Sequence, residues 1–387
     1  MENPDPGELR EFAPQWVLYW GNRMSRSQYA IWEPFLRRSR FRYLVLVDGP
    51  GAVPREVQEQ AADLPNVAFA HSGWPKERLN DVASVLGVLY VGHRPQNAGA
   101  IAALPGLAHV FIGHGNSGKR SSGARLALQY DSVLVASYGD LVRWAPPVRR
   151  RLRLRVCAVG APVVEGLDGP APTGPAPQRP RVLYLPTWEG KSLAADYSSL
   201  GPVLSSLRAA PPVGCEELTM RPHPGTGNVR REVRALRDGV AAFTTGPPLD
   251  KAAAMLRADV AVCDISGVAS EFLFTRKPIV LPWGPHLRDR GLTRKRVQAL
   301  YPFAHLWDVS GPSLDEAVHA AQHDAALAHR RERAADEVFR GHRSLDEAVR
   351  TFDVALSVMP LRRTRVPLRV LFEARLRLAG LRRGDRR

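Results

Sequence analysis

Short runs of apolar residues, bounded by turn-forming residues and separated by stretches with helical periodicity, recur along most of the 387-residue chain. This alternation is typical of parallel strands connected by crossover helices. In the first half, the runs that predict strands are Trp16–Trp20, Tyr43–Asp48, Val67–His71, Val85–Gly92, His109–His114 and Ser132–Ser137. In the second half they are Arg181–Pro186, Glu217–Arg221, Val240–Thr245, Val260–Asp264, Pro278–Pro282 and His305–Val309. The pattern therefore predicts two doubly wound α/β domains in tandem.

The two sets of strands are separated by a segment, 166–180, that is too rich in Pro and Gly to sustain a helix or a sheet ladder. We therefore expect an N-terminal domain at 1–165, a linker at 166–180 and a C-terminal domain at 181–358. The last domain closes with helices predicted over Ser313–Ser357, and 359–387 is expected to be a basic amphipathic tail. Two domains of this kind leave a crevice at the carboxyl ends of their strands, where such folds bind ligands.

Charge is the compositional feature that bears most on function. Lys and Arg number 54 against 38 Asp and Glu, which gives a formal net charge of +16. Half of it, +8, lies in Leu361–Arg387, where ten arginines outnumber Glu373 and Asp385. This bias favours an anionic partner, such as a phosphate-bearing substrate, nucleic acid or a membrane surface. The contents of hydrophobic residues (44%) and charged residues (24%) are ordinary for globular proteins and exclude disordered and fibrous classes.

The sequence also indicates where the protein works. No apolar run approaches the roughly 20 residues that span a bilayer, and Met1–Gly21 lacks the features of a signal peptide. We therefore expect a cytoplasmic protein that is not exported. Cys157, Cys215 and Cys263 lie far apart in no C-x-x-C pattern, so they are expected to be reduced core residues. No cluster has metal-ligand spacing, and neither a metal nor another cofactor is expected.

The first candidate motif is Phe111–Arg120, FIGHGNSGKR, in which a predicted strand runs into a glycine-rich loop. Backbone amides in such a loop can cradle a phosphate. The run from Gly113 to Lys119 nearly spells a Walker A loop, but Arg120 stands where a Ser or Thr would hold Mg²⁺. This disfavours an ATPase, and a glycine-rich turn without a ligand is the remaining alternative.

Two further motifs follow predicted strands of the second domain. Pro186-Thr187-Trp188 ends one strand and places a hydroxyl and an indole at the edge of the sheet. His223 lies between two prolines, which fix φ and hold the imidazole on a rigid, non-helical turn. A turn without a ligand is the alternative in this case too.

The most informative run is Ala258–Trp283, in which a buried strand ends at Asp264 and leads into a short helix. Ser266 is a natural N-cap, and Gly267 lets a phosphate approach the first helical amides. Glu271, one turn further on, is placed to accept ribose hydroxyls. The alternative is that Asp264 and Ser266 only cap the helix.

Taken in order, four motifs resemble the CDP-glycerol glycerophosphotransferase family, which builds teichoic-acid-type polymers. They are Gly113-His114-Gly115, Tyr184-Leu185-Pro186-Thr187-Trp188, Arg221-Pro222-His223-Pro224 and Asp264-Ile265-Ser266-Gly267. The resemblance covers roughly His109–Phe352. It implies a GT-B-like fold, with two Rossmann-like domains facing a central cleft. It also implies a metal-independent donor site mainly in the second domain and an acceptor side in the first.

The resemblance assigns two catalytic histidines. His114 matches the family's H-G-T-P histidine and is the expected general base, while His223 matches its H-P histidine and is expected to neutralise the pyrophosphate. The expected donor-binding residues are Pro186, Thr187, Asp264, Ser266, Gly267, Ser270 and Glu271. The expected substrate-binding residues are Gly115, Asn116, Ser117, Lys119 and Arg221. The chain departs from the family pattern where Asn116-Ser117 replaces Thr-Pro, Ile265 replaces Tyr and Gly267 replaces Ser, which leaves the CDP-glycerol identity open.

The resemblance predicts transfer of glycerol phosphate, or a similar polyol phosphate, from a CDP-linked donor to a hydroxyl of a cell-envelope glycan or a lipid-linked acceptor. The run Ser266–Glu271 also resembles the donor site of GT-B sugar transferases. A glycosyltransferase that uses a nucleotide sugar for cell-surface polysaccharide is therefore the alternative. Nucleic acid is not an expected partner, because no recognised binding motif accompanies the charge.

The C-terminal segment suggests a second kind of partner. After Pro367, its apolar residues are expected to gather on one side of a helix, with arginines flanking them, which suits the surface of an anionic membrane. The apolar residues are Leu368, Leu371, Phe372, Leu376 and Leu378, and the arginines are Arg369, Arg375 and Arg377. This predicts peripheral association with the inner face of the plasma membrane. A solvated tail and a helix packed on the first domain are the alternatives.

Overall fold

The computed structural model describes residues 3–21, 26–48, 64–70, 73–113, 125–162, 165–167, 176–190, 192–193, 196–360 and 367–381. The chain divides into two compact units. Unit 1 comprises Met1–Gly115, Arg120–Pro162 and Phe339–Arg387, and unit 2 comprises Asn116–Lys119 and Val163–Val338.

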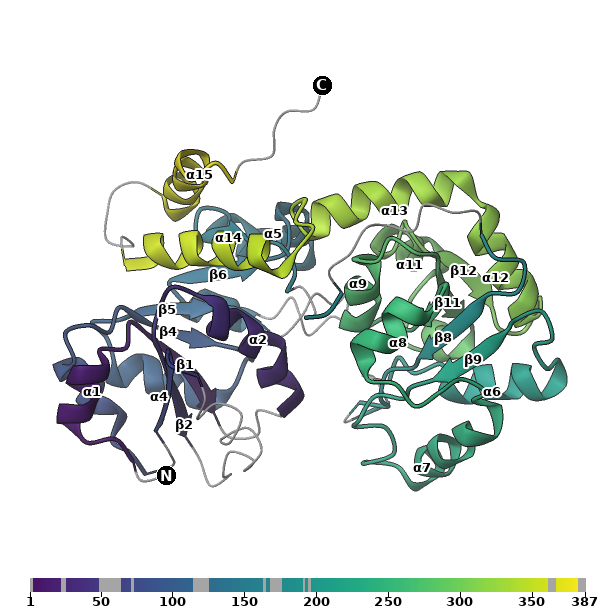
Figure 1. The fold of residues 1–387 in the computed structure, drawn as a ribbon, viewed down its shortest axis with the longest axis horizontal. Coiled ribbons are helices and arrows are strands. Elements are labelled where there is room, and N and C mark those ends of the chain that lie inside the picture. The colour runs from purple at the N-terminus through teal and green to yellow at the C-terminus, as the bar shows by residue number, and fades with distance from the viewer. Residues whose placement is uncertain are drawn as a thin grey trace. The chain divides into compact units, whose positions relative to one another are not determined.

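Unit 1 is built on a parallel sheet with the strand order β3-β2-β1-β4-β5-β6-β7 (Figure 1). Its strands are β1 (Trp16–Gly21), β2 (Tyr43–Asp48), β3 (Val67–Ala70), β4 (Gly87–Tyr90), β5 (Ala108–Phe111), β6 (Ser132–Val135) and β7 (Val156–Ala158). Its α-helices are α1 (Pro6–Phe12), α2 (Arg26–Arg38), α4 (Pro95–Ala103), α5 (Pro146–Leu152), α14 (Leu345–Val358) and α15 (Leu368–Leu378). Short 3-10 helices are η1 (Lys76–Asp81), η3 (Arg125–Gln129) and η4 (Tyr138–Arg143). The six strands predicted in this part of the chain are confirmed, and the three-residue strand β7 is additional.

Unit 2 is built on a second parallel sheet with the order β12-β11-β10-β8-β9. Its strands are β8 (Arg181–Leu185), β9 (Glu217–Met220), β10 (Val260–Cys263), β11 (Ile279–Trp283) and β12 (His305–Asp308). Its helices are α6 (Leu200–Ala209), α7 (Arg231–Asp238), η6 (Gly239–Phe243), α8 (Lys251–Arg257), α9 (Gly267–Leu273), α10 (Pro285–Arg288), α11 (Arg294–Leu300), α12 (Leu314–His323) and α13 (Ala325–Val338). From β8 the chain winds outward to β9, and from β10 it winds the other way to β11 and β12. The neighbours β8 and β10 therefore form the switch point, where doubly wound sheets bind ligands.

One predicted strand of unit 2 is wrong. The run Val240–Thr245 lies in η6 and the turn after it, because the chain passes directly from α7 into a 3-10 helix at Gly239. Only Thr245 pairs with the sheet: its amide donates to the carbonyl of Leu218 (2.8 Å), and its hydroxyl oxygen accepts from the amide of Leu218 (2.9 Å). Val240 is buried in the core of unit 2, although it lies in a 3-10 helix and not in a strand.

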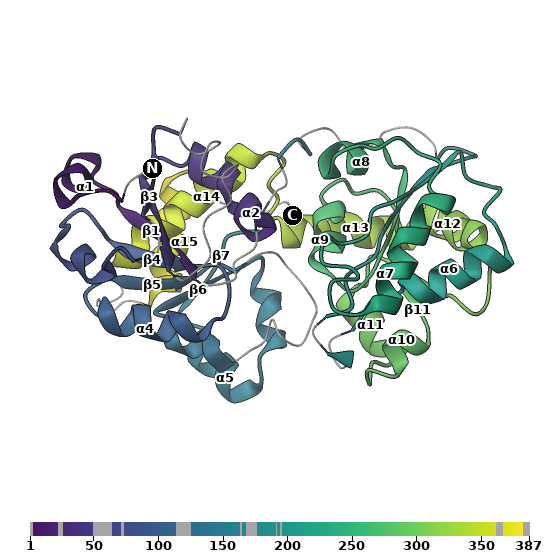
Figure 2. The same ribbon diagram turned by 90° about the horizontal axis from the view of Figure 1, so that it is seen from below.

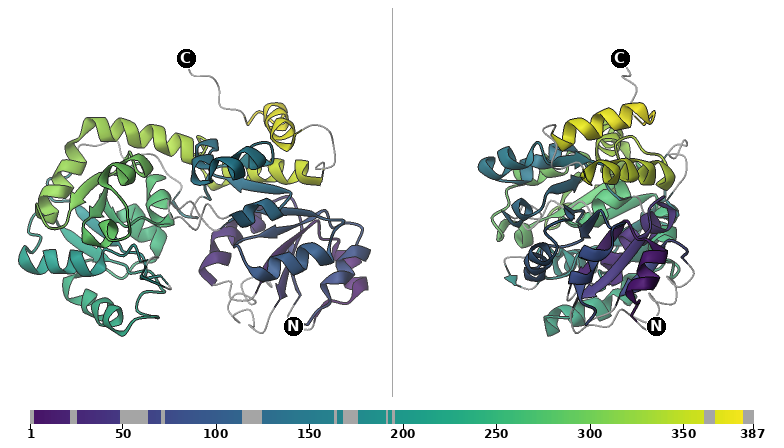
Figure 3. Two further views of the ribbon diagram at one scale, coloured as in Figure 1. Left: turned by 180° about the vertical axis from the view of Figure 1, so that it is seen from behind. Right: turned by 90° about the vertical axis from the view of Figure 1, so that its left-hand side faces the viewer.

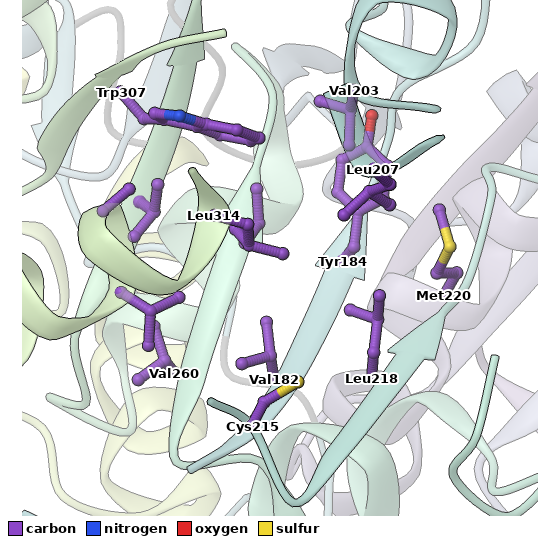
Figure 4. Packing of buried hydrophobic residues seen from close by; sticks show 14 of the residues in the cluster. Val182, Tyr184, Val203, Leu207, Cys215, Leu218, Met220, Val260, Trp307 and Leu314 are labelled. Atoms are coloured by element: carbon purple, nitrogen blue, oxygen red, sulfur yellow. The ribbon is translucent and has the colours of Figure 1, made fainter. Parts of the chain in front are cut away.

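The sheet of unit 2 is covered on both faces, as its continuously apolar strands require. Figure 2 shows α6 and α12 on one side of this sheet and α8 and α9 on the other. On the α6 and α12 side, buried residues of the strands and both helices form one core, part of which Figure 4 shows. Its members include Val182, Tyr184, Val203, Leu207, Leu218, Met220, Val260, Trp307 and Leu314. This packing fixes the strand ends that carry the site.

The C-terminal helices α14 and α15 belong to unit 1, so the units divide after Val338 rather than after residue 358. Phe352 of α14 packs on Trp32 and Phe35 of α2, with ring centroids 5.3 and 5.7 Å apart. The α15 helix lies against α14 (Figure 3). No helix among the described residues is long and apolar enough to cross a membrane.

Candidate functional site in unit 2

Three loops that carry predicted site residues leave the same edge of the sheet of unit 2. They follow the neighbouring strands β9, β8 and β10, beginning at Arg221, Pro186 and Asp264. Because the three strands are parallel, their carboxyl ends lie together. The structure thus brings together the predicted residues of unit 2.

The carboxylate of Asp264 joins the two sides of the switch point. The side chain is 1% exposed, and its Oδ2 accepts hydrogen bonds from the amides of Thr187 (2.7 Å) and Ser199 (3.1 Å). Its Oδ1 accepts a hydrogen bond from the hydroxyl of Ser199, the residue before α6. Hydrogen bonds to a charged acceptor are the strong kind. Asp264 therefore holds the loop after β8 and the start of α6 against the end of β10.

His223 continues the ladder between β8 and β9. The amide of Arg221 donates to the carbonyl of Tyr184 (2.9 Å), and the amide of His223 donates to the carbonyl of Pro186 (3.1 Å). Amides of successive residues face opposite sides of a strand, so Pro222 and Pro224 occupy positions that face the outer edge of β9. Since β9 is an edge strand, no ladder bond is lost there. The two prolines thus stiffen the turn at no cost in sheet pairing.

The imidazole of His223 is held in one orientation. The amide of Gly225 donates to its Nδ1 (2.9 Å), and its ring stacks on Trp188 with a centroid distance of 6.1 Å. A nitrogen that accepts a hydrogen bond carries no proton, so the neutral ring bears its proton on Nε2. A Cβ at position 225 would lie 3.1 Å from Nδ1 and 3.4 Å from Trp188, so a glycine there allows this contact. His223 is exposed at this edge of the sheet.

Glu189, which the sequence analysis did not single out, organises the rest of the His223 loop. Its carboxylate is 1% exposed and accepts from the amides of Gly227 (3.0 Å), Val229 (3.1 Å) and Arg230 (3.3 Å). Burial by itself would raise the pKa of Glu189, but these bonds and one from its own amide lower it. Gly227 has φ +77°, and a Cβ there would lie 2.6 Å from the Cα of Arg234. An ionised buried carboxylate thus fixes the turn after His223.

The predicted catalytic, donor-binding and substrate-binding residues of unit 2 fall into a buried and a more accessible set. The buried set comprises Pro186, Thr187 (3% exposed), Asp264 (1%), Ser266 (8%) and Ser270 (7%). Ser266 precedes α9, but its hydroxyl donates to the carbonyl of Asp264 (3.2 Å) and makes no cap bond to the helix. The accessible set comprises Arg221, His223, Gly267 and Glu271. The accessible set is exposed or half-buried at this edge, while Asp264 of the buried set binds the neighbouring loop and the start of α6.

Two accessible side chains are tied to the start of α8. Glu271 accepts a hydrogen bond from the ammonium of Lys251 (2.9 Å), and the guanidinium of Arg221 donates to the carbonyl of Leu249. The accessible groups at this edge therefore include the guanidinium of Arg221, the ammonium of Lys251 and the imidazole of His223. The carboxylate of Glu271 is paired with Lys251, and those of Asp264 and Glu189 are buried and bonded to amides. Accessible N–H donors of this kind suit an anionic ligand.

The predicted residues of the first domain are not all within the described chain. His114, Gly115, Asn116, Ser117 and Lys119 lie outside the described residues. The preceding Gly113 is described and has φ +66°, and its carbonyl accepts from the indole of Trp32 (2.7 Å). The strand that leads to these residues, β5, is confirmed, but their assignment stays a prediction.

Two further histidines lie at carboxyl edges, and the sequence analysis missed both. In unit 1, His93 follows β4 and stacks on Phe111 of β5, with ring centroids 4.0 Å apart and an interplanar angle of 6°. In unit 2, His286 follows β11, and burial lowers its pKa to about 4, so it is neutral near pH 7. Neither has a motif around it that could have been recognised.

Comparisons with known proteins bear on the fold. No family model matches the chain, and no curated protein matches it. Among solved structures, the UDP-GlcNAc 2-epimerase from Neisseria meningitidis bound to UDP-GlcNAc is similar, with a TM-score of 0.51 and 12% identity, over 87% of this chain and 98% of that one. Anabaena HepE in complex with UDP and glucose is similar too, with a TM-score of 0.50 and 12% identity, over 89% of this chain and 99% of that one. The wall teichoic acid polymerase TagF has a TM-score of 0.49 and 12% identity, over 91% of this chain and 93% of that one.

The fold is GT-B-like. It consists of two Rossmann-like units, each with a parallel sheet, as the sequence predicted. Among the described residues of this GT-B-like chain, no group of three or more His, Cys, Asp or Glu side chains is arranged to hold a metal ion. Metal independence is therefore still a prediction about the reaction.

We expect the lowered pKa of Glu189 to appear as a pH-dependent part of the stability of unit 2. In Glu189→Gln, an amide group replaces one acceptor oxygen of the carboxylate. The free energy of unfolding of unit 2 should therefore fall by about 1–3 kcal/mol near pH 7. A depressed carboxyl pKa stabilises the fold above the unfolded value of about 4.3, and this contribution disappears as the pH falls through the folded value. The difference between wild type and variant should therefore shrink below about pH 4. Urea unfolding at several pH values measures it. The exposed Glu216→Gln is the control, and a difference independent of pH would contradict the ionised state of Glu189.

Proposed function

We propose that this chain is a transferase that binds a nucleotide-diphosphate donor at the carboxyl edge of the sheet of unit 2. The transferred group is glycerol phosphate or a similar polyol phosphate from a CDP-linked donor, and the acceptor is a hydroxyl of a cell-envelope glycan or lipid-linked molecule. The observation that carries the proposal is the fixed imidazole of His223, whose proton-bearing Nε2 lies among loops tied together by Asp264 and Glu189.

The proposed reaction is an in-line displacement at phosphorus. The acceptor oxygen attacks the β-phosphorus, the bond from that phosphorus to the oxygen bridging it to the α-phosphorus breaks, and CMP leaves with that oxygen. The acceptor's proton passes to a general base, which the family resemblance assigns to His114. No covalent intermediate with the protein is needed.

The groups of unit 2 would stabilise the leaving nucleotide. As negative charge develops on CMP, the Nε2–H of His223 can donate to a phosphate oxygen, and Arg221 and Lys251 add positive charge nearby. These groups are fixed before the ligand arrives, so little reorganisation opposes the reaction. Glu271, which pairs with Lys251, would accept ribose hydroxyls of the donor.

A nucleotide-sugar transferase is the second candidate, and one observation favours it. Two solved structures of similar fold contain UDP-GlcNAc and UDP with glucose. In that reaction the bond between the sugar's anomeric carbon and a β-phosphate oxygen breaks, and UDP leaves. The same edge of unit 2 would hold the donor, so the candidates differ in the donor, the bond that breaks and the nucleotide that leaves.

The nucleotide released from a donor panel distinguishes these functions. The full chain is incubated with CDP-glycerol, CDP-ribitol and UDP- and GDP-sugars, in EDTA, and the products are read by mass spectrometry. We expect CMP from a CDP-linked polyol. UDP or GDP release would establish the second candidate, and loss of activity in EDTA that Mg²⁺ or Mn²⁺ restores would contradict metal independence.

The role of His223 predicts a specific loss. His223→Ala removes the donor to the leaving phosphate, so kcat should fall by about 10² while the fold is retained. His319→Ala, an exposed histidine of α12 in the same unit, is the matched control and should leave kcat unchanged. Steady-state kinetics with the donor found above provide the measurement. Normal turnover in His223→Ala would show that this loop is not part of the active site.

A further inference from the structure

The helix α15 carries two separate apolar stripes rather than one. Leu368, Phe372 and Leu376 recur every four residues and are buried, at 6%, 0% and 0% exposed. The helix lies against α14 and β7, and Figure 3 shows it beside α14, so the buried inner stripe belongs to the interior of unit 1. Three of the five apolar residues that the sequence predicts on the membrane-facing side of the helix are therefore buried within unit 1.

Polar contacts fix the orientation of α15 on unit 1. Glu373 accepts from the hydroxyl of Tyr138 (2.8 Å) and pairs with the guanidinium of Arg340 (3.0 Å). The guanidinium of Arg369 lies 3.7 Å from the ring centroid of Tyr138. The helix cannot roll to present its inner stripe without breaking these contacts.

The second stripe faces outward. Val370, Ala374 and Leu378 also recur every four residues, and Val370 and Leu378 are 54% and 84% exposed. At 100° per residue, Arg377 lies on one side of this outer stripe and Arg375 on the other, and both are exposed. An exposed apolar line between two arginines matches the pattern of helices that lie in a membrane interface.

A neighbouring helix extends the basic surface. The amide of Arg369 donates to the carbonyl of Leu154 (3.4 Å), so the end of α5 lies beside the start of α15. The α5 segment contributes the exposed arginines Arg149, Arg150, Arg151 and Arg153, and Leu154 is 46% exposed. The only carboxylate on either helix is Glu373, which is already paired. Exposed arginines and exposed apolar side chains therefore lie on two adjoining segments of unit 1.

We propose that α5 and the outer stripe of α15 form a docking surface for an anionic lipid bilayer. The arginines bind headgroup phosphates, while Val370, Leu378 and Leu154 enter the interface. The apolar residues decide between partners, because a soluble polyanion such as RNA would use the arginines and leave these side chains in water. This inference does not depend on the proposed reaction.

Vesicle sedimentation of the full chain tests the surface. The protein should bind phosphatidylglycerol vesicles at about 50 mM salt, release them at about 500 mM salt, and bind phosphatidylcholine vesicles poorly. Each arginine near an anionic leaflet changes partitioning about fivefold, so the double variant Arg375→Glu, Arg377→Glu should lose at least about 25-fold. The variant Arg330→Glu, Arg333→Glu, which makes the same charge change on exposed positions of α13, should bind as wild type does. Point substitutions are preferable to deletion, because removing α15 would uncover its inner stripe.

A fluorescent label tests whether the outer stripe enters the bilayer. The three native cysteines are buried, so Leu378→Cys can be labelled selectively with an environment-sensitive dye. Its emission should shift to the blue on phosphatidylglycerol vesicles, whereas the same dye on Val213→Cys, an 80% exposed position in unit 2, should not respond. Three results would overturn the proposal: equal binding by both double variants, no dye response at 378, or binding to RNA without binding to vesicles.

Discussion

The buried carboxylate of Asp264 connects the two halves of the sheet of unit 2, and the geometry of the candidate site depends on it. In a doubly wound sheet, the strands on either side of the switch point continue in opposite directions, so their loops diverge. Three hydrogen bonds to Asp264 oppose that divergence by joining the loop after β8 and the start of α6 to the end of β10. The cost of burying the carboxylate is offset by these three hydrogen bonds, two from backbone amides and one from a hydroxyl.

The ordering of His223 follows from the same arrangement. Once the loop after β8 is fixed, the carbonyl of Pro186 can accept from His223, and Glu189 can bind the amides that follow. Gly225 then sets the tautomer of the imidazole. The exposed groups are thus oriented by buried ones, and pre-organisation of this kind is what stabilisation of a leaving phosphate requires.

The sequence predicted the parts of this structure that depend on local pattern. Eleven of the twelve predicted strands are confirmed, because parallel strands covered on both faces are largely apolar, and only the three-residue strand β7 was not predicted among the described residues. The exception, Val240–Thr245, shows that a short apolar run does not separate a strand from a buried 3-10 turn. Glu189 was missed because its partners lie about forty residues away and a loop glutamate has no local signature. The sequence predicts a single apolar side for α15 where the structure has a buried and an exposed stripe, because spacing alone does not reveal which side a neighbouring helix covers.

Hydrogen–deuterium exchange of the full chain with and without CDP, UDP or GDP tests the central claim most directly. That claim is that the nucleotide binds to the loops after β8, β9 and β10. The account predicts that at least one nucleotide slows exchange in 186–190, 221–228 and 264–271 together, because the three loops share one edge. Protection confined to unit 1, or protection of only one of the three loops, would contradict it.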